Sequence, residues 1–295
     1  MKMFDPHIHM TSRTTDDYQK MAEAGITVVC EPAFWMGQPR THASSFEDYF
    51  LSLVGWERFR ASQFGIHHFC TIALNPKEAN NANLADDVLA MMPRYLEKES
   101  VIAVGEIGLD DQTDAEVYYL KKQVELAKEF ELPVLVHTPH RDKKHGSMRC
   151  IDIILETGID PSLVLIDHNN EETIEETLRS GCWAGHSIYP ETKMDEERMA
   201  RIVKRFGPEK IIINSAADWG VSDTLMVPKT VAKMRDIGVS EADIERVVWD
   251  NPIAFFAQSG RITKSALEKD VLRDQTQLFS GNSVLRGQTP QVDSI

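Results

Sequence analysis

Short apolar runs rich in β-branched residues alternate with amphipathic segments eight times along the chain. Runs of this kind are expected of strands buried on both faces, and apolar residues at helical spacing mark the segments between them. The expected strands cover residues 3–9, 26–30, 66–74, 101–108, 132–138, 163–167, 182–188 and 210–215. Helices are expected at residues 15–24, 46–63, 84–98, 117–130, 147–157, 171–179 and 195–206, with further helical pieces from 240 to 258. The pattern indicates a parallel sheet covered by helices, and eight such units close into a (β/α)8 TIM barrel.

The length supports one large domain followed by a segment of different character. A (β/α)8 barrel takes about 250 residues, and the chain has 295, of which 42% are hydrophobic. We assign residues 1–261 to the barrel. Residues 262–295 are rich in Gln, Ser, Thr, Asp and Gly, a composition typical of disordered tails. We predict that this C-terminal extension packs on its own barrel or on a partner chain, and a partner chain would give a homo-oligomer.

The N-terminus and the cysteines bear on the cellular compartment. The chain begins without the pattern of a signal peptide, and it has no apolar run of the length that a membrane helix needs. Its four cysteines are widely separated and show no Cys-x-x-Cys spacing, so we expect reduced thiols rather than disulfides or a thiolate zinc site. These features predict a cytoplasmic protein that does not bind membranes.

The net charge of −14 makes extended nucleic acid an unfavourable partner, because an acidic surface repels phosphate backbones. It favours a small or weakly charged substrate instead. One basic run is an exception: Arg141, Lys143, Lys144, His145 and Arg149. This run is either a solvated basic segment or a binding site for a compact anionic group.

Two histidines, His7 and His9, lie two residues apart in the first apolar run. On a strand their imidazoles leave the same face, which suits a divalent metal such as Zn²⁺. Alone, such a pair is also compatible with hydrogen-bonded core residues or chance surface residues. In a (β/α)8 barrel, however, side chains at the carboxyl ends of the strands converge on one mouth. On that rule six residues face the same place: His7, His9, Glu106, His137, His168 and Asp218.

Four histidines and two carboxylates form a nitrogen and oxygen set that suits zinc and could hold manganese or nickel. Because six protein ligands exceed what one tetrahedral ion needs, we predict two ions with a bridging hydroxide. His7, His9 and Asp218 would hold one ion, His137 and His168 the other, and Glu106 would bridge them. Taken one at a time, Glu106 could instead pair with a buried arginine, and either later histidine could be a core residue.

A catalytic role is expected for Glu106 and for Asp218, which would orient the attacking water and take its proton. Asp5 would support the two N-terminal histidines, or would simply be a hydrogen-bonded structural residue. Weaker candidates for substrate contact lie in loops or at strand ends near the same mouth, where ordinary loop residues are equally expected: Arg40, His42, His140, Arg141, His186 and Trp219.

Several strings resemble the TatD-like metal-dependent hydrolases of the amidohydrolase superfamily. They are Asp-Pro-His-Ile-His at residues 5–9, Gly-Glu-Ile-Gly-Leu-Asp at 105–110, Leu-Pro-Val-Leu-Val-His at 132–137, and Asn-Pro at 251–252 followed by two phenylalanines. The resemblance covers about residues 1–260. It implies a (β/α)8 barrel, a one- or two-metal site with the ligands above, and hydrolysis.

The chain also departs from that family. Residues 214–220 replace the acidic-Thr-Asp string that usually follows strand eight, which displaces Asp218. The His-Pro after strand three is Asn75-Pro76, and residues 111–113 replace an aromatic-Arg segment. Family members contact substrate at these places, so we expect a divergent member.

Three functions follow from the sequence. The leading one is a metal-dependent hydrolase that uses a metal-bound hydroxide on a small phosphoester, ester, lactone or amide. The second is a DNase or phosphodiesterase like some TatD relatives. The third is a catalytically silent metal-binding barrel within a pathway complex.

Overall fold

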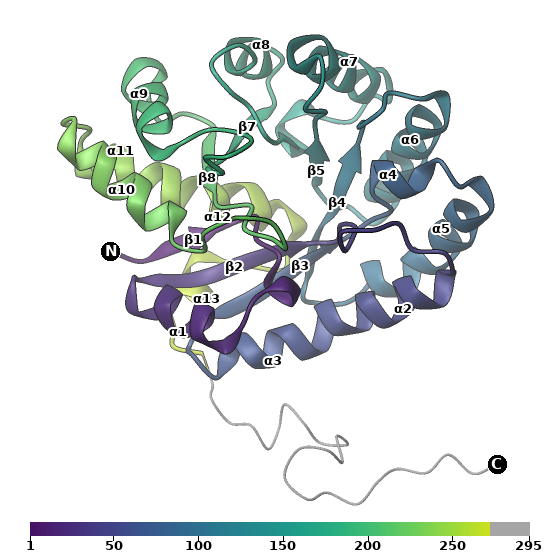
Figure 1. Cartoon of the computed structure of the whole chain (residues 1–295), viewed down its shortest axis with the longest axis horizontal. Helices are drawn as coiled ribbons and strands as arrows, with labels where there is room; N and C mark the ends of the chain where they lie inside the picture. Colours follow the sequence, from purple (N-terminus) through teal and green to yellow (C-terminus); the bar gives the residue numbers. More distant parts are fainter. Residues whose placement is uncertain (272–295) are drawn as a thin grey trace, which may run out of the picture.

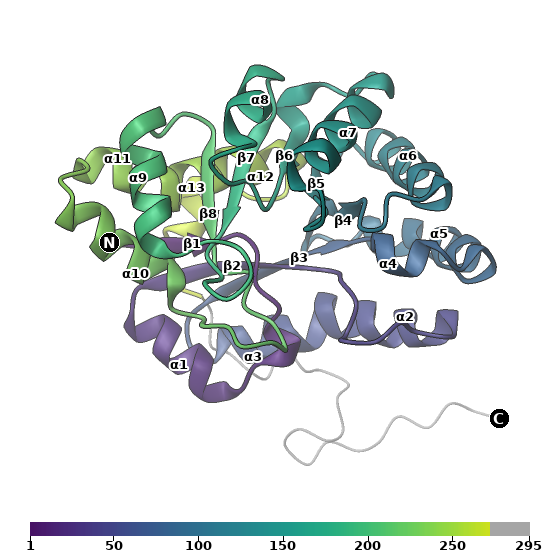
Figure 2. The ribbon, with the colours of Figure 1, turned by 45° about the horizontal axis from the view of Figure 1, so that its top comes forward.

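The computed structural model describes residues 1–271, and within them eight strands form one sheet in chain order, each parallel to the next. The strands are β1 (Met3–Asp5), β2 (Ile26–Pro32), β3 (His67–Ile72), β4 (Val101–Gly108), β5 (Val134–His137), β6 (Val164–Ile166), β7 (Trp183–Ser187) and β8 (Ile211–Asn214). Helices lie around the outside of the strands (Figure 1 and Figure 2). The predicted (β/α)8 fold is confirmed.

Most of the outer helices fall close to their predicted positions, whereas the short helix α4 was not predicted. They are α1 (Thr15–Glu23), α2 (Ala43–Leu51), α3 (Glu57–Ser62), α4 (Pro76–Ala79), α5 (Ala82–Leu96), α6 (Asp114–Glu129), α7 (Lys143–Glu156), α8 (Ile174–Arg179) and α9 (Glu196–Phe206). The last part of the described chain holds α10 (Met226–Asp236), α11 (Glu241–Glu245), α12 (Asn251–Phe256) and α13 (Lys264–Leu267). Helix α10 was not predicted from the sequence. Its proline, Pro228, lies in the first turn, where a missing N–H is tolerated.

The first strand is shorter than predicted, because β1 ends at Asp5 rather than at His9. Pro6 follows and has no N–H to donate to a neighbouring strand. Backbone hydrogen bonds still hold the segment beyond it: Ile8 N–H donates to Cys30 O at 3.2 Å and His9 N–H donates to Ala217 O at 2.8 Å. The second of these bonds joins the segment after β1 to the segment after β8. The two histidines therefore sit just past the strand, on backbone that helps to close the barrel.

The amino end of the barrel is plugged by the C-terminal helices. Phe255 and Phe256 of α12 are fully buried, and they belong to one apolar cluster with residues near the starts of the strands, such as Phe4 and Leu135. Asn251 fixes α12 by donating to the carbonyl of Ile211 at 2.7 Å. Because this end is filled, the opposite end, where the strands finish, is left to form a site.

The described part of the predicted C-terminal extension begins on this plug. Ile262 and Leu267 are buried in the same apolar cluster. Residues 272–295 lie outside the described part of the chain, so packing of the whole extension and the boundary at residue 261 stay predictions. All four cysteines are buried and free. In residues 1–271, no helix combines the length and apolar character needed to cross a membrane.

Candidate metal centre

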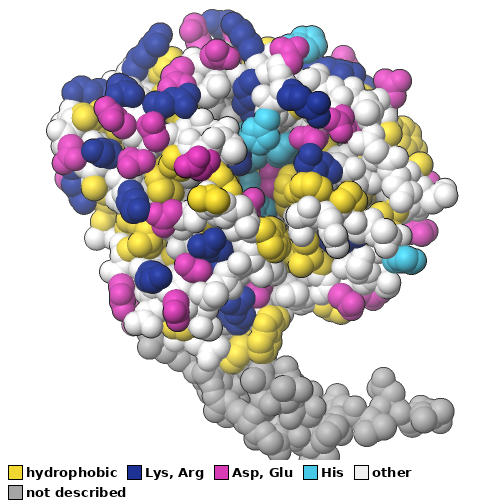
Figure 3. All heavy atoms as spheres, in the orientation of Figure 1, with side chains coloured by type: hydrophobic (Ala, Val, Ile, Leu, Met, Phe, Trp, Pro, Cys, Tyr) yellow, Lys and Arg dark blue, Asp and Glu magenta, His cyan; other side chains and the backbone are white. Residues whose placement is uncertain are grey.

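Four histidines and one glutamate converge at the carboxyl end of the barrel. His7 and His9 follow β1, Glu106 lies in β4, His137 ends β5, and His168 follows β6. All five side chains are at least 95% buried, and they line a cavity of about 220 Å³. In the space-filling view, histidine side chains lie at the bottom of a hollow near the centre of this face (Figure 3). The structure thus brings together five of the six predicted ligands.

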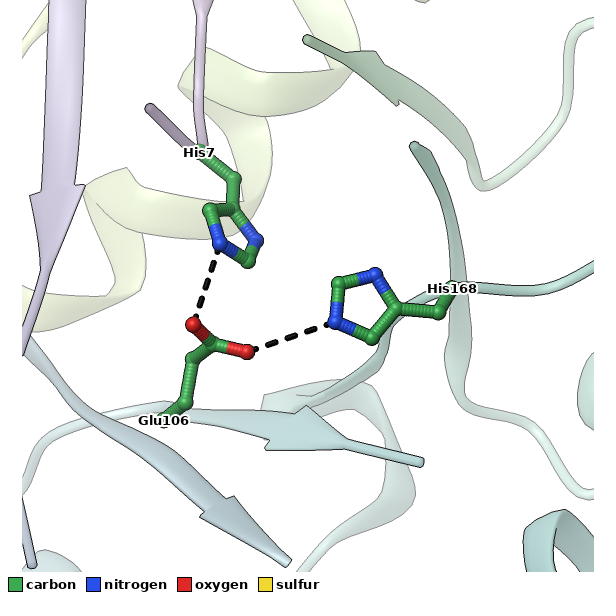
Figure 4. A group of neighbouring side chains, drawn as sticks. All are labelled: His7, Glu106 and His168. Atoms are coloured by element: carbon green, nitrogen blue, oxygen red, sulfur yellow. Dashed lines mark ion pairs between the residues drawn. The ribbon is translucent and has the colours of Figure 1, made fainter. Parts of the chain in front are cut away.

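Glu106 lies between two pairs of histidines. Its Oε1 atom is 3.1 Å from His7 Nε2 and 3.6 Å from His9 Nε2. Its Oε2 atom is 3.2 Å from His137 Nδ1 and 3.4 Å from His168 Nε2. Figure 4 shows the carboxylate pointing between His7 and His168, with one oxygen toward each ring. Each oxygen of the Glu106 carboxylate therefore lies next to a different pair of histidines.

The charges in this cluster depend on one another. Burial acts to raise the pKa of Glu106, but the charge of His7 and hydrogen bonds with His137 and His168 outweigh it and hold the pKa well below its usual range. Burial acts to lower the pKa of His7, but the charges of Glu106 and Asp167 raise it to about 10. Burial and the charge of His7 lower the pKa of His9 to about 4. The negatively charged Glu106 carboxylate at the centre thus favours positive charge on the groups around it.

The donor atoms fit a divalent metal. His7 Nε2 and His9 Nε2 lie 3.1 Å apart, and His137 Nδ1 and His168 Nε2 are also 3.1 Å apart. Ring nitrogens that face one another in this way offer more lone pairs than the protons of neutral imidazoles can satisfy. Glu106 Oε1 is buried and accepts no hydrogen bond in the described structure. Ligand atoms of His7, Glu106 and His168 lie within 4.8 Å of one another, close enough to hold one ion together.

Asp218, the sixth predicted ligand, lines the same cavity from the loop after β8. Its Oδ1 atom accepts hydrogen bonds from Tyr189 Oη at 3.0 Å and from Gly220 N–H at 2.8 Å. Within residues 1–271, no ion pair under 4.0 Å joins Asp218 to a histidine. The Asp218 carboxylate is therefore held at the cavity wall, beside the cluster rather than in its centre.

Two aspartates support the N-terminal histidines in different ways. Asp167 Oδ2 accepts a hydrogen bond from His7 Nδ1 at 2.6 Å, which leaves Nε2 free to face the cluster. Asp5 Oδ1 instead accepts from the backbone N–H of His7 at 3.4 Å and of Ser215 at 3.2 Å. Burial raises the pKa of Asp5 to about 6. Asp5 thus supports the backbone between β1 and β8, whereas the sequence analysis missed Asp167, although it directly precedes His168.

The weaker substrate candidates are only partly brought together. His140 lines the cavity, and its ring stacks on His168 at 6.0 Å between centroids. Trp219 lies 5.9 Å from the His9 ring and is 39% exposed. Four others are placed elsewhere: Arg40 pairs with Glu78 at 2.7 Å, His42 is exposed before α2, Arg141 pairs with Asp111 at 2.6 Å, and His186 is buried against Ala184 O.

Arg40 illustrates why the sequence misplaced such residues. Its guanidinium lies over the rings of Phe46 and Tyr49, at 4.3 and 4.4 Å from their centroids, and donates to Phe34 O. A charged loop residue can thus be fixed by packing that sequence order does not show. Further cavity residues were not predicted from the sequence. They are Lys77 of α4 and the loop residues Phe34, Trp35, Asp110, Tyr189, Thr192 and Lys193. Asp110 alone had a signal, as the last residue of the Gly-Glu-Ile-Gly-Leu-Asp string.

Comparison with known proteins identifies the family. Residues 4–257 match the family described as TatD related DNase. The chain belongs to the TatD family. An uncharacterized metal-dependent hydrolase of Methanocaldococcus jannaschii is 30% identical over 257 residues, which cover 86% of this chain and 99% of the relative. A human deoxyribonuclease is 24% identical over 284 residues, covering 86% and 94%.

A solved TatD-like protein from Archaeoglobus fulgidus has the same fold, with a TM-score of 0.71 and 28% identity. The likeness covers 86% of this chain and 99% of that one. The family predicted from the sequence motifs is confirmed. The chain is a metal-dependent hydrolase of the TatD type, and its buried His, Glu and His cluster is suited to a divalent metal.

Proposed function

We propose that this TatD chain hydrolyses a small phosphoester, ester, lactone or amide at a centre of two divalent ions. The observation that carries the proposal is the position of Glu106, which turns one carboxylate oxygen to each of two histidine pairs. A divalent ion at such a site polarises the substrate and lowers the pKa of its bound water from 15.7 towards about 7. His7 and His9 would hold one ion, His137 and His168 the other, and Glu106 both. The nitrogen-rich set favours zinc, with manganese or nickel as alternatives.

The chain's own residues would divide the remaining work. Asp167 keeps His7 Nδ1 protonated and so directs its Nε2 lone pair inward. Ser187 holds His168 in the same manner, at 2.7 Å from its Nδ1. Asp218 would accept the proton of the attacking water, with Tyr189 orienting its carboxylate. Asp218, which lines the same cavity, would also be a ligand of the ion held by His7 and His9.

The size and charge of the site support a small substrate. The cavity of about 220 Å³ is below the range of about 300–1,000 Å³ typical of sites for drug-sized ligands. The protein's net charge of −14 opposes extended nucleic acid. DNA hydrolysis is the second candidate, because a relative is named a deoxyribonuclease. Binding that weakens steeply with salt would favour that second function.

Two further proposals concern the cellular compartment and the assembly of the chain. Four buried, free thiols support a reducing compartment, the cytoplasm. The C-terminal extension would serve as a contact between copies of the chain, which sedimentation of the full chain and of a chain ending at residue 271 would test.

The first experiment is elemental analysis of protein purified without chelator or nickel affinity, followed by a screen of phosphomonoesters, phosphodiesters, esters, lactones and amides. We expect close to two ions per chain and turnover in at least one class. Asp218→Asn should keep most of the metal and lower kcat by about 10²- to 10⁴-fold, the usual contribution of a general base. Unchanged kcat in this variant would exclude Asp218 as the base, and absence of metal after reconstitution would refute the two-ion centre.

A further inference from the structure

A second, smaller cavity opens beside the metal centre. Its volume is about 110 Å³, and it shares His140, His168, Thr192 and Lys193 with the main cavity. On its other side lies Lys143, the first residue of α7. We call it the side pocket. The shared residues place the two cavities next to each other at the carboxyl end of the barrel.

Two lysines line the side pocket without a carboxylate partner. Lys143 Nζ donates to Thr138 Oγ1 at 2.5 Å and lies 3.4 Å from Thr138 O. Lys193 Nζ lies 4.8 Å from the centroid of the Tyr189 ring. Among residues 1–271, neither ammonium forms an ion pair, whereas Lys77, on the main cavity, pairs with Asp110 at 2.5 Å. Neither lysine of the side pocket thus has a carboxylate within ion-pair distance, and the carboxylates of the site act on them only from further away.

The surroundings act on the two lysines in both directions, because burial lowers their pKa while the charge of Asp167 acts to raise it. Burial lowers the pKa of Lys143 to about 7, and the charge of Lys193 acts in the same direction. Burial lowers the pKa of Lys193 as well. His140 is neutral, because burial and the charge of Lys193 lower its pKa to about 4. Both lysines are half-buried, and an anion bound between them would favour their charged forms.

The position of Lys143 also resolves the basic run of residues 141–149. Arg141 is exposed and pairs with Asp111, and Arg149 donates to Gln112 O at 2.7 Å. Lys144 and His145 are exposed on α7. Lys143 alone among these residues lines the side pocket. The run is therefore not one basic surface, and a single member of it joins Lys193 from the loop after β7.

We propose that Lys143 and Lys193 bind a compact anionic group, a carboxylate or a phosphate, that the substrate carries beside the bond to be hydrolysed. The inference rests on the proposed function for the placement of that bond at the metal centre. It specifies the substrate as a small bifunctional molecule, with its reacting group at the metal centre and its anion in the side pocket. Two ammonium groups that line one small pocket can give such an anion charge-assisted hydrogen bonds.

Titration calorimetry on the metal-loaded full chain tests this inference without needing turnover. The probes are glutarate, its single-anion counterpart pentanoate, and 3-phosphonopropionate. One anionic end of each probe can reach the metals, and only the dianions can also reach the lysines. We expect the better dianion to bind at least about 10-fold more tightly than pentanoate, as for a hydrogen bond to a charged group. The factor by which the lysine-to-methionine variants below weaken each dianion shows which of the two is bound more strongly through the lysines.

Variants of single lysines identify the residues responsible. Lys193→Met and Lys143→Met should each remove most of the preference for the dianion, so that the affinity for the dianion falls by a larger factor than the affinity for pentanoate while metal content is retained. Lys193→Arg should retain it. Lys144→Met is the matched control, because this exposed neighbour on α7 does not line the pocket, and it should behave as the parent chain.

Two results would overturn the inference. One is equal affinity of the parent chain for glutarate, 3-phosphonopropionate and pentanoate, and the other is an undiminished preference in both lysine-to-methionine variants. Failure of the proposed function has a different signature. A chain that binds metal and prefers dianions, yet hydrolyses nothing in the substrate screen, would keep the side pocket and lose the hydrolytic assignment.

Discussion

Glu31 and Glu106 are both buried glutamates on barrel strands, and both contact histidine, yet their surroundings differ. Glu31 on β2 contacts one histidine, with its Oε2 atom 2.9 Å from His68 Nε2, and its Oε1 atom accepts from Thr11 N–H at 2.7 Å. Glu106 on β4 contacts four histidines and opens to the cavity. Both glutamates are buried, so burial does not distinguish Glu31 from Glu106.

The difference appears in their charge states. Burial raises the pKa of Glu31 to about 8 and lowers that of His68 to about 4, so this close pair is neutral near pH 7 and its short contact is a hydrogen bond rather than an ion pair. The histidines around Glu106 reverse the effect of burial and keep it charged. A buried carboxyl group that is neutral and has a hydrogen-bond partner for each oxygen serves a structural role. A charged carboxylate surrounded by several imidazole nitrogens is suited to bind a cation.

The largest expected effect comes from removing the charge of each glutamate in turn. Glu106→Gln takes away the anion that both histidine pairs face, so we expect loss of most bound metal and a decrease in kcat/KM on the order of 10³-fold or more. Glu31→Gln keeps the shape and hydrogen-bonding capacity of a group that is neutral already. It should change metal content and kcat/KM by less than about 2-fold, within the usual range for a conservative change away from the site.

Elemental analysis and steady-state kinetics on the two variants check this contrast. Equal losses in both would mean that Glu31 belongs to the site. Full metal content in Glu106→Gln would mean that the ions bind elsewhere, and it would remove the basis of the comparison.

A smaller effect is expected from Asp167, whose short contact with a cluster ring is the one with His7, and which also accepts from the backbone N–H of His168 at 2.6 Å. In Asp167→Asn an amide replaces the carboxylate that accepts the His7 Nδ1 proton at 2.6 Å, so the favoured tautomer is no longer fixed. Partners of this kind contribute about 10- to 100-fold to metal affinity. Metal titration against a competing chelator measures the loss. Asp5→Asn serves as the comparison because Asp5 contacts only backbone of His7, and an equal loss there would show that fold, not the ring, was disturbed.

The sequence was sufficient for the fold because the information is local and repeated. Val101–Gly108 was located to the residue, since an apolar run bounded by helix and turn has few alternatives. The barrel rule then brought His137 and His168 next to Glu106 from widely separated positions. The error at β1 has a local cause as well, because Pro6 ends the hydrogen-bonded ladder before the two histidines do.

Loop residues could not be placed in this way. Lys193 and Tyr189 reach the cavity because the loop after β7 folds back through a hydrogen bond from Lys193 N–H to Tyr189 O at 2.8 Å. Arg40 does not line the cavity, because its guanidinium pairs with Glu78. Neither contact has a periodic signal in the sequence, and the pair of Arg40 and Glu78 also joins residues far apart along the chain. Asp167 was missed for a different reason, since a strand-end aspartate beside a histidine looks like either a ligand or a support.

The smallest predicted effect concerns stability above neutral pH and uses Glu31 alone. Its pKa rises from an ordinary 4.5 to about 8 on folding, so the folded chain binds this proton more tightly than the unfolded chain. The resulting stabilisation is complete below pH 4.5 and is lost as pH rises through about 8. The pKa of His68 is lowered on folding, so its titration reduces the stability of the protein only below its ordinary pKa of 6.5. Between pH 6.5 and 8.5, therefore, the titration of Glu31 can be separated from that of its partner.

Over that interval the free energy of unfolding of the parent chain should fall, relative to Glu31→Gln, by about 1 kcal/mol per pH unit. Urea unfolding of both chains at pH 6.5, 7.5 and 8.5 gives the difference, in which other titrating groups cancel. Glu23→Gln, an exposed change on α1, is the control and should track the parent. A constant difference between parent and Glu31→Gln would mean that Glu31 is charged in the folded chain. In that case His68 would be its charged partner, and the two buried glutamates would differ only in how many histidines they face.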